Sequence, residues 1–99
     1  MEGDRQRLDR WLWHARLVKT RTLAAELAAS GHVRLNGKRI AAPGRAVRPG
    51  DVLTIALTSS VRVLRIIDLA ARRGGSGEAK RLYDDLGAAK SLAGKNDVR

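Results

Sequence analysis

Cationic side chains are the residues of this sequence best suited to chemistry, and the chemistry they suit is the binding of phosphate. The chain carries 15 arginines and 5 lysines against 10 acidic residues, for a net charge of +10 and a pI of about 11.4. The planar guanidinium of arginine offers two parallel hydrogen bonds to a phosphate group. Such a surplus on a 99-residue chain is typical of a protein that binds a polyanion, most often nucleic acid.

The positive charge is concentrated in the first half of the chain. Residues 1–48 carry 11 basic and 4 acidic side chains, whereas residues 49–99 carry 9 and 6. This unevenness argues against the alternative that the arginines merely form a solvated surface. A second basic stretch, Arg72-Arg73, precedes Gly74-Gly75-Ser76-Gly77, and we expect it to form a flexible loop that makes a second contact.

Residue sets for catalysis or metal binding are not apparent in the sequence. Cysteine is absent, which excludes disulfides and thiolate ligands. His14 and His32 lack the spacing of metal ligands, so we expect neither a metal nor a cofactor. The glycines at 74–77 lack the Lys-Ser or Lys-Thr ending of a nucleotide-binding loop. We therefore expect a binding protein and not an enzyme.

The hydropathy pattern bears on where the protein acts. No apolar run approaches 18 residues, so we expect no membrane span. The charged N-terminus lacks the apolar core of a signal peptide, and we expect a cytoplasmic protein.

Two amphipathic helices are predicted in the basic half, because apolar residues recur there at helical spacing. The stripe of the first helix comprises Leu8, Trp11, Leu12 and Ala15. The face of the second helix comprises Leu23, Ala24, Leu27 and Ala28. Either Thr20 or Thr22 can cap the second helix, and Gly31 stands where a left-handed residue ends a helix.

A hairpin and further strands are predicted after the helices. Val33 and Leu35 alternate with polar residues, and Asn36-Gly37 is the strongest two-residue hairpin signal. Residues 38–41 then form the return strand. The apolar runs 52–57 and 61–67 predict an antiparallel pair with a bulge near Leu64.

The remaining residues complete the predicted organisation. Residues 78–86 favour a short helix with Leu82 and Leu86 facing inward. We divide the chain into a loose N-terminus (1–6), a binding domain with its following strands (7–70), a basic loop with a short helix (71–86) and a disordered tail (87–99).

Four residues of the first helix have expectations of their own, and for Asp9, Trp11 and Trp13 these include a purely structural role. Asp9 is expected to pair with a neighbouring arginine or to cap a backbone amide. Trp11 lies on the apolar stripe and is expected in the core, whereas Trp13 is equally suited to the core and to stacking on a base. Arg7, Arg10 and His14 are expected to lie together on a face of this helix other than the apolar stripe.

The order of these elements directs the basic side chains toward one surface. The expected RNA-binding residues are Arg7, Arg10, Lys19, Thr20, Arg21, Asn36, Lys38 and Arg39, with Arg72 and Arg73 as a second contact. RNA helices display phosphates on both sides of a groove, and a basic ridge of this width can span them. Thr20 and the first amides of its helix can also bind a phosphate. Asn36 fits a 2′-hydroxyl or base edge as well as an ordinary hairpin turn.

The motifs of this half resemble the S4 RNA-binding domain, a module built on an αL motif. In chain order they are Arg7-Leu8-Asp9, Thr20-Arg21, Gly31-His32-Val33, Asn36-Gly37 and Pro49-Gly50-Asp51. Thr20 stands where serine is common in that family. The resemblance covers about residues 7–55 and implies an α+β fold, with two short helices packed on a small, mainly antiparallel sheet and a short C-terminal helix. It also implies binding of structured RNA without catalysis.

Further segments are similar to the small ribosome-associated heat-shock members of this family in bacteria. They are Asp9-Arg10-Trp11-Leu12-Trp13, Lys19-Thr20-Arg21 and Leu82-Tyr83-Asp84-Asp85. This resemblance implies rRNA, the large ribosomal subunit and peptidyl-tRNA as partners, and a role in rescuing stalled subunits that carry a nascent chain. The residues alone leave open a general RNA- or DNA-binding module, a module for an acidic protein, and an accessory subunit of a separate RNA-modifying enzyme. We expect a monomer.

Overall fold

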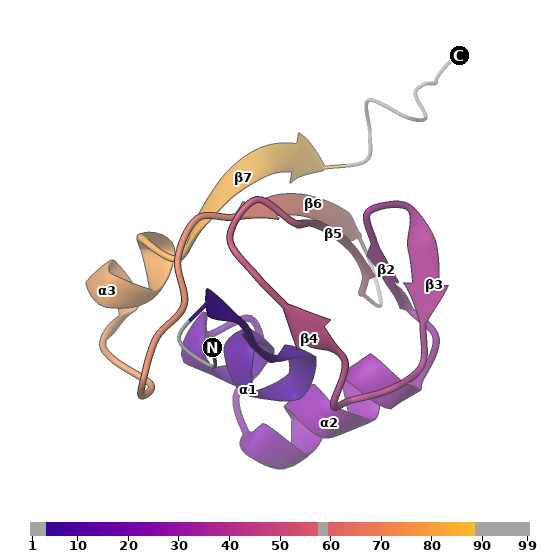
Figure 1. Cartoon of the computed structure of the whole chain (residues 1–99), viewed down its shortest axis with the longest axis horizontal. Helices are drawn as coiled ribbons and strands as arrows, with labels where there is room; N and C mark the ends of the chain where they lie inside the picture. The colour runs from indigo at the N-terminus through magenta and orange to yellow at the C-terminus, as the bar shows by residue number, and fades with distance from the viewer. Residues whose placement is uncertain (1–3, 58–59, 89–99) are drawn as a thin grey trace.

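The chain folds as two helices packed against one face of a curved antiparallel sheet (Figure 1). The structure is a computed structural model that describes residues 4–57 and 60–88. Its elements in chain order are β1 (Gln6–Arg7), α1 (Leu8–His14), α2 (Arg21–Ala29), β2 (Val33–Leu35), β3 (Lys38–Ile40), β4 (Ala46–Val47), β5 (Val52–Ala56), β6 (Val61–Ile66), α3 (Ser76–Lys80) and β7 (Tyr83–Ala88). The predicted α+β class is therefore confirmed.

The strands form one main sheet and one small ribbon. The main sheet has the order β3-β2-β5-β6-β7, and every neighbouring pair in it is antiparallel. The ribbon pairs β1 with β4, so that Gln6, expected in the loose N-terminus, instead lies opposite Val47. This pairing holds the residues just before α1 against the segment between β3 and β5.

The predicted hairpin between β2 and β3 is confirmed. Asn36 and Gly37 have φ values of +52° and +89°, the positive values that both central residues of a type I′ turn require. The turn places Leu35 opposite Lys38 and Arg34 opposite Arg39.

Both predicted N-terminal helices are confirmed, and each begins for a local reason. The amides of Leu8 and Asp9 donate to the backbone carbonyls of Arg45 and Pro43, at 2.8 and 3.1 Å. At the start of α2, the amide of Leu23 donates to the Thr20 hydroxyl oxygen at 3.0 Å, so Thr20 is the N-cap.

The core lies between α1 and the inner face of the sheet. Trp11 is fully buried, as predicted, and its ring meets the Tyr83 ring edge-on at 6.2 Å between centroids. Its indole Nε1 donates to the backbone oxygen of Asp68 at 3.0 Å, which links α1 to the chain after β6. The other fully buried large side chains are Leu8, Leu12, Val33, Val47, Leu53, Ile55, Leu64 and Ile66.

The second helix packs differently from the prediction. Ala24 and Ala28 are buried, but Leu23 is 44% exposed although we expected it on the apolar face. Small alanines bring the backbone of α2 close to α1, and Leu23 then lies outside the contact.

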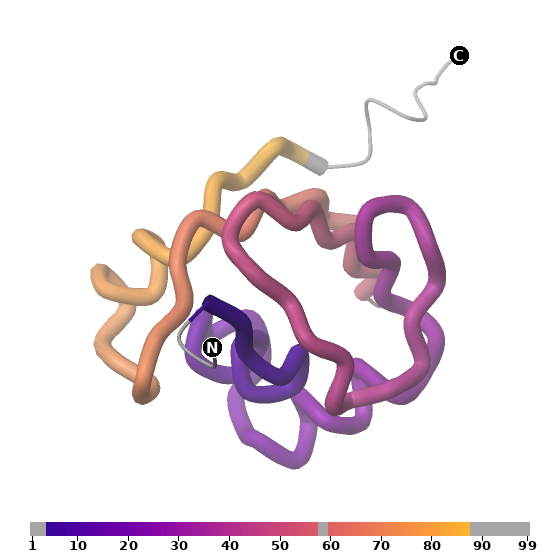
Figure 2. The backbone as a smooth tube through the Cα atoms, viewed as in Figure 1, coloured from indigo at the N-terminus to yellow at the C-terminus, as the bar shows by residue number. Residues whose placement is uncertain are grey.

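The segment after β6 is not the flexible loop that its glycines suggested. Figure 2 shows it running beside α1, and hydrogen bonds fix it there. Arg73 Nε donates to the Trp13 carbonyl at 3.0 Å, and Arg16 Nε donates to the Gly74 carbonyl at 2.8 Å. The side-chain amide of Gln6 donates to the Ala70 carbonyl at 2.7 Å.

The helix predicted over residues 78–86 is wrong beyond its first turn. Helix α3 ends at Lys80, and residues 83–88 instead form β7, which pairs with β6. Leu82 is buried as expected, but Leu86 is 43% exposed. A helix this short is marginal by itself, and β7 covers the otherwise open hydrogen-bonding edge of β6. Residues 89–99 of the predicted tail lie outside the described residues.

Substitution of Trp11 tests the link between α1 and the chain after β6. We expect Trp11→Phe to lower the free energy of unfolding by about 2 kcal/mol, because it removes the indole donor and leaves a small cavity. Leu23→Ala is the control, and its exposed side chain predicts a change within about 0.5 kcal/mol. Urea denaturation followed by tryptophan fluorescence and circular dichroism measures both. Equal stabilities of Trp11→Phe and the wild-type protein would contradict the role given to this contact.

Candidate nucleic-acid interface

Helix α1, the start of α2 and the chain after β6 line an open basic pocket of about 400 Å³. Its lining residues are Arg10, Trp13, His14, Arg21, Ala71, Arg72 and Arg73. None of them is acidic. The pocket thus brings together two members of the first predicted contact, Arg10 and Arg21, with both members of the second.

Three of the four arginines lining this basic pocket have no ion-pair partner among the residues that the structure describes. The ion pairs within the described ranges are Arg7–Asp9 and Arg62–Asp85, so no paired carboxylate neutralises Arg10, Arg21 or Arg72. The Nε of Arg21 is buried and has no hydrogen-bond partner. Guanidinium groups in this state are ready donors for an anion from outside the protein.

Arg73 has a different role from its three neighbours. Besides its bond to the Trp13 carbonyl, its Nη2 donates to the Val18 carbonyl at 3.4 Å. The guanidinium carbon lies 5.5 Å from the centre of the Trp13 ring, a cation–π contact. Arg73 therefore holds the wall of the pocket, and the position of Trp13 in this contact favours packing over base stacking.

His14 lines the basic pocket together with Arg10, in agreement with the face predicted for them, whereas Arg7 lies outside the pocket. The side chain is buried, with 3% exposure. Burial lowers the pKa of the imidazole, a backbone hydrogen bond at Ala70 opposes this, and the charges of Arg10, Arg21 and Arg73 lower it further. The ring is therefore neutral at physiological pH, and its Nδ1 has no hydrogen-bond partner in the described part of the chain.

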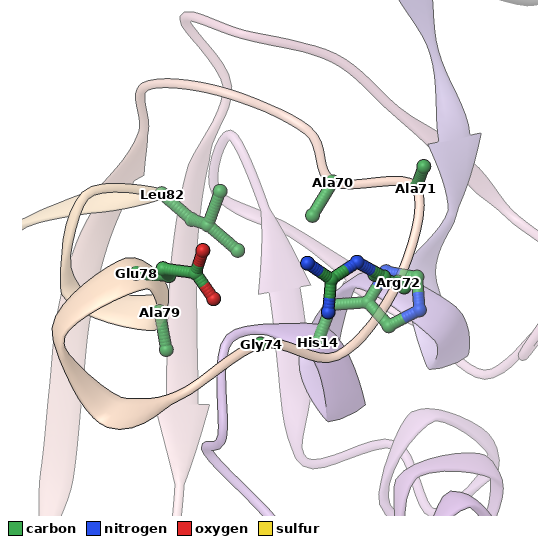
Figure 3. Close-up of a pocket in the computed structure, with 8 residues that line it drawn as sticks. All are labelled: His14, Ala70, Ala71, Arg72, Gly74, Glu78, Ala79 and Leu82. Atoms are coloured by element: carbon green, nitrogen blue, oxygen red, sulfur yellow. The ribbon is translucent and has the colours of Figure 1, made fainter.

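A smaller pocket of about 200 Å³ adjoins the basic pocket. His14, Ala71 and Arg72 line both. Figure 3 shows Arg72 and His14 at one side of the smaller pocket and the Glu78 carboxylate, from α3, at the other. Glu78 Oε1 accepts a hydrogen bond from the Gly75 amide at 3.0 Å.

Arg7 lies outside the basic pocket and pairs with Asp9, as predicted for that carboxylate. Arg7 Nε and Nη2 donate to the two carboxylate oxygens of Asp9, both at 3.0 Å. Burial alone would raise the pKa of Asp9, but the hydrogen bonds and charge of Arg7 outweigh it and hold this pKa below its usual value. The Arg7 side chain is 55% exposed, so the pair leaves part of its surface open.

Lys19 lies at another groove, which is mainly apolar. The residues lining that groove are Val18, Lys19, Leu23, Glu26, Leu27, Ser30, His32 and Leu57. The structure therefore does not place Lys19 in the basic pocket with Arg10 and Arg21. The contact that we predicted between Lys19 and RNA remains a prediction.

The hairpin cations divide between two faces. Lys38 lies opposite the inward-facing Leu35, whereas Arg39 lies opposite Arg34 on the other face of the sheet. Two exposed arginines directly opposite each other repel, which makes Arg34 a candidate anion contact that our sequence reasoning missed. The sequence already indicated that Arg34 pairs with Arg39, because a two-residue turn at Asn36-Gly37 fixes the register of the two strands.

The side chain of Asn36 is engaged within the protein. Its Oδ1 accepts from the Val52 amide at 2.9 Å, and its Nδ2 donates to Asp51 Oδ1 at 3.1 Å. These bonds join the hairpin turn to the start of β5, which gives Asn36 a structural role. Its contact with RNA remains a prediction.

The described part of the chain shows neither a metal-binding cluster nor a membrane-spanning helix. Residues 4–57 and 60–88 contain no group of three or more histidine or acidic side chains that could hold a metal ion. No helix among them has the length and apolar character to cross a membrane.

Comparisons with known proteins agree with these motifs and this fold. The S4 domain family model matches residues 6–53, which confirms the S4 RNA-binding domain that the motifs predict. The Heat shock protein 15 homolog of Aeromonas salmonicida is 34% identical over 90 residues, covering 91% of this chain and 67% of that protein. The trimeric structure of Vibrio cholerae Heat Shock Protein 15 superimposes with a TM-score of 0.78 at 33% identity, covering 97% of this chain and 100% of that one.

The chain therefore belongs to the heat shock protein 15 family of S4-domain proteins. It spans about 60% of the length of the relatives from Haemophilus influenzae and Escherichia coli. The RQC P-site tRNA stabilizing factor of Bacillus subtilis is also similar, at 38% identity over 63 residues, covering 64% of this chain and 72% of that protein.

Two substitutions of Asn36 separate its backbone and side-chain contributions. Asn36→Gly loses the side-chain hydrogen bonds, but glycine still adopts the positive φ without strain. Asn36→Ala loses the same hydrogen bonds and is also strained at this positive φ. We expect the alanine variant to be less stable than the glycine variant by about 1 kcal/mol. Urea unfolding measures the difference. An alanine variant as stable as the glycine variant would show that the turn does not depend on this conformation.

The Arg7–Asp9 pair predicts a pH dependence of stability. The folded pKa of Asp9 lies below its unfolded value of about 4, so the pair's contribution is complete above that pH and is lost as pH falls through the folded pKa. The wild-type protein should therefore exceed Asp9→Asn in unfolding free energy by a constant amount from pH 5 to 7. The difference should shrink toward pH 2. A difference that does not vary over this whole range would contradict the assignment.

Proposed function

We propose that this protein binds structured rRNA or tRNA on the large ribosomal subunit and holds stalled subunits that still carry a nascent chain on tRNA. The observation that carries the proposal is the set of unpaired arginines, Arg10, Arg21 and Arg72, gathered in one basic pocket. Folded RNA presents phosphates on rigid surfaces, which suits cations held on helices and a hairpin. The proposal places the protein in the cytoplasm, where ribosomal subunits are found.

The relatives support the ribosomal address of this proposal. The name of the Bacillus subtilis relative states that it stabilises tRNA in the ribosomal P site. A nascent chain on a stalled large subunit is attached to such a tRNA. We therefore propose the same kind of complex for this chain, with peptidyl-tRNA as part of the surface that is recognised.

The mechanism we propose is positioning without chemistry. Arg10 and Arg21, on α1 and α2, engage phosphates of one RNA segment, and Lys38 on the hairpin engages another. The packing of α2 on α1 through Ala24 and Ala28 and the hydrogen bond between Asn36 and Val52 keep these cations at fixed separations. Contacts at fixed separations favour folded RNA over a flexible strand, whose phosphates have no fixed spacing.

Co-sedimentation with purified ribosomal subunits tests the proposal. We expect binding at near-physiological salt to the large subunit, stronger when it carries peptidyl-tRNA. Equal binding to both subunits that disappears as salt rises would instead indicate a general RNA- or DNA-binding module. Sedimentation of the free protein in the same buffer tests the expected monomer against the trimer of the Vibrio cholerae relative.

Single substitutions identify the cations that carry this binding. Arg21→Ala and Lys38→Ala should each weaken binding to the loaded large subunit by about tenfold, because each removes a charge-assisted phosphate contact. Arg65→Ala is the matched control, since Arg65 is exposed on β6, lies opposite Asp84 of β7 and does not line the basic pocket. Thermal melting confirms that each variant is folded. Wild-type affinity in the Arg21→Ala, Lys38→Ala double variant would refute the proposed contact surface.

A further inference from the structure

The basic pocket is assembled from two separate parts of the chain. Arg10 and Arg21 belong to the residues that match the S4 domain, 6–53, whereas Arg72 follows β6 and lies outside the match. The hydrogen bond between Arg73 and the Trp13 carbonyl and that between Arg16 and the Gly74 carbonyl hold Arg72 at the pocket. A residue beyond the S4 domain therefore completes a site that begins within it.

The donors in this pocket need an acceptor that the protein does not supply. None of Arg10, Arg21 and Arg72 is paired with a carboxylate within the described ranges, and the buried Nε of Arg21 has no partner. Collecting like charges is unfavourable in the free protein, and burial of an unpaired donor adds to that cost. An anion with several acceptor oxygens relieves both effects at once.

The donors and walls of the pocket favour a phosphate over a base. Arg10, Arg21 and Arg72 present charged donors to it, and its volume of about 400 Å³ leaves room for a phosphate with the attached sugar. Arg73 covers one face of the Trp13 ring, and the His14 ring lies 5.5 Å from it between centroids. Arg73 thus occupies a face of the partly exposed Trp13 ring on which a base would otherwise stack.

We propose that this pocket is a phosphate socket that takes one phosphate group of RNA, held by Arg10, Arg21 and Arg72. The RNA source of that phosphate rests on the proposed function. Two sources share this chemistry: an internal phosphodiester at a sharp bend of folded RNA, and a terminal phosphomonoester. Arg72 is the element that distinguishes the socket from a general basic surface, since it reaches the S4 cations from outside their domain.

His14 provides an internal reporter of the socket. It is faced by Arg10, Arg21 and Arg73, by Arg72 at the shared wall of the two pockets, and by Glu78 across the smaller one. The nearby positive charges help to hold its pKa below the usual value. An anion in the socket offsets these charges, so occupancy should raise the pKa of His14 and couple phosphate binding to proton uptake.

Nuclear magnetic resonance titrations of the full chain test the socket directly. With inorganic phosphate as the probe, we expect shifts at the backbone amides of residues 10–14, 21 and 71–73, and an upward shift of the His14 pKa. Chloride at equal ionic strength is the control. Equal effects of phosphate and chloride, or a His14 pKa that does not respond to phosphate, would overturn the socket.

Substitution of Arg72 tests its use in binding RNA. Against a short RNA hairpin, Arg72→Ala should weaken binding about tenfold and reduce the salt slope by about one, and Arg72→Lys should restore part of the affinity. Arg65→Ala is the control for loss of one charge elsewhere. Equal losses in Arg72→Ala and Arg65→Ala would overturn the socket. RNA hairpins that end in a 5′-phosphate or in a 5′-hydroxyl identify the source of the bound phosphate. Only a site for a terminal phosphomonoester distinguishes these two RNAs.

Failure of the socket and failure of the proposed function give different results. If Arg72→Ala binds the loaded large subunit as the wild-type protein does, while Arg21→Ala does not, the socket is wrong and the ribosomal proposal stands. If the wild-type protein shows the phosphate response and the Arg72-dependent hairpin binding but does not bind subunits, the socket stands and the ribosomal proposal is wrong.

Discussion

The attachment of the chain after β6 to helix α1 is the constraint on which the rest of this structure depends. The indole of Trp11 donates to the Asp68 carbonyl from within the core, and Arg73 donates to the Trp13 carbonyl near the end of the helix. These bonds fix the path of the chain before α3, and hence the point from which β7 returns to β6. The same attachment sets Arg72 beside cations that are far from it in sequence. Core packing and the composition of the basic pocket therefore follow from one set of contacts.

The parts of the fold that the sequence predicted are those set by neighbouring residues. Helix α1 follows from an apolar stripe, the start of α2 from the Thr20 hydroxyl, and the hairpin from Asn36-Gly37 with its positive φ values. In each case the deciding interaction spans only a few residues of the chain. The pairing of Asp9 with a neighbouring arginine was predictable for the same reason.

The features that sequence reasoning missed are set by contacts across the fold. Residues 83–88 have a helical pattern locally, but the open edge of β6 makes them a strand. Helical spacing placed His14 on a face with Arg10, but it did not indicate that the chain around Ala70 and Arg72 would bury this side chain. The candidate contacts were predicted as two groups, and nothing local indicated that Arg72 joins Arg10 and Arg21 while Lys19 does not.

The electrostatics of the pocket explain why a neutral histidine lies among arginines. A charged imidazole at His14 would add repulsion to a cluster that lacks a paired carboxylate, and the lowered pKa avoids this in the free protein. Asp9 is close enough for Arg21 to lower its pKa slightly, but its oxygens are bound to Arg7 and do not neutralise the pocket. Asp9 is thus engaged by Arg7, and positive potential stays concentrated in the basic pocket, whose lining contains no acidic residue. Potential concentrated in this way attracts an anion to a defined position, whereas the same charge spread over the surface would attract it without positioning it.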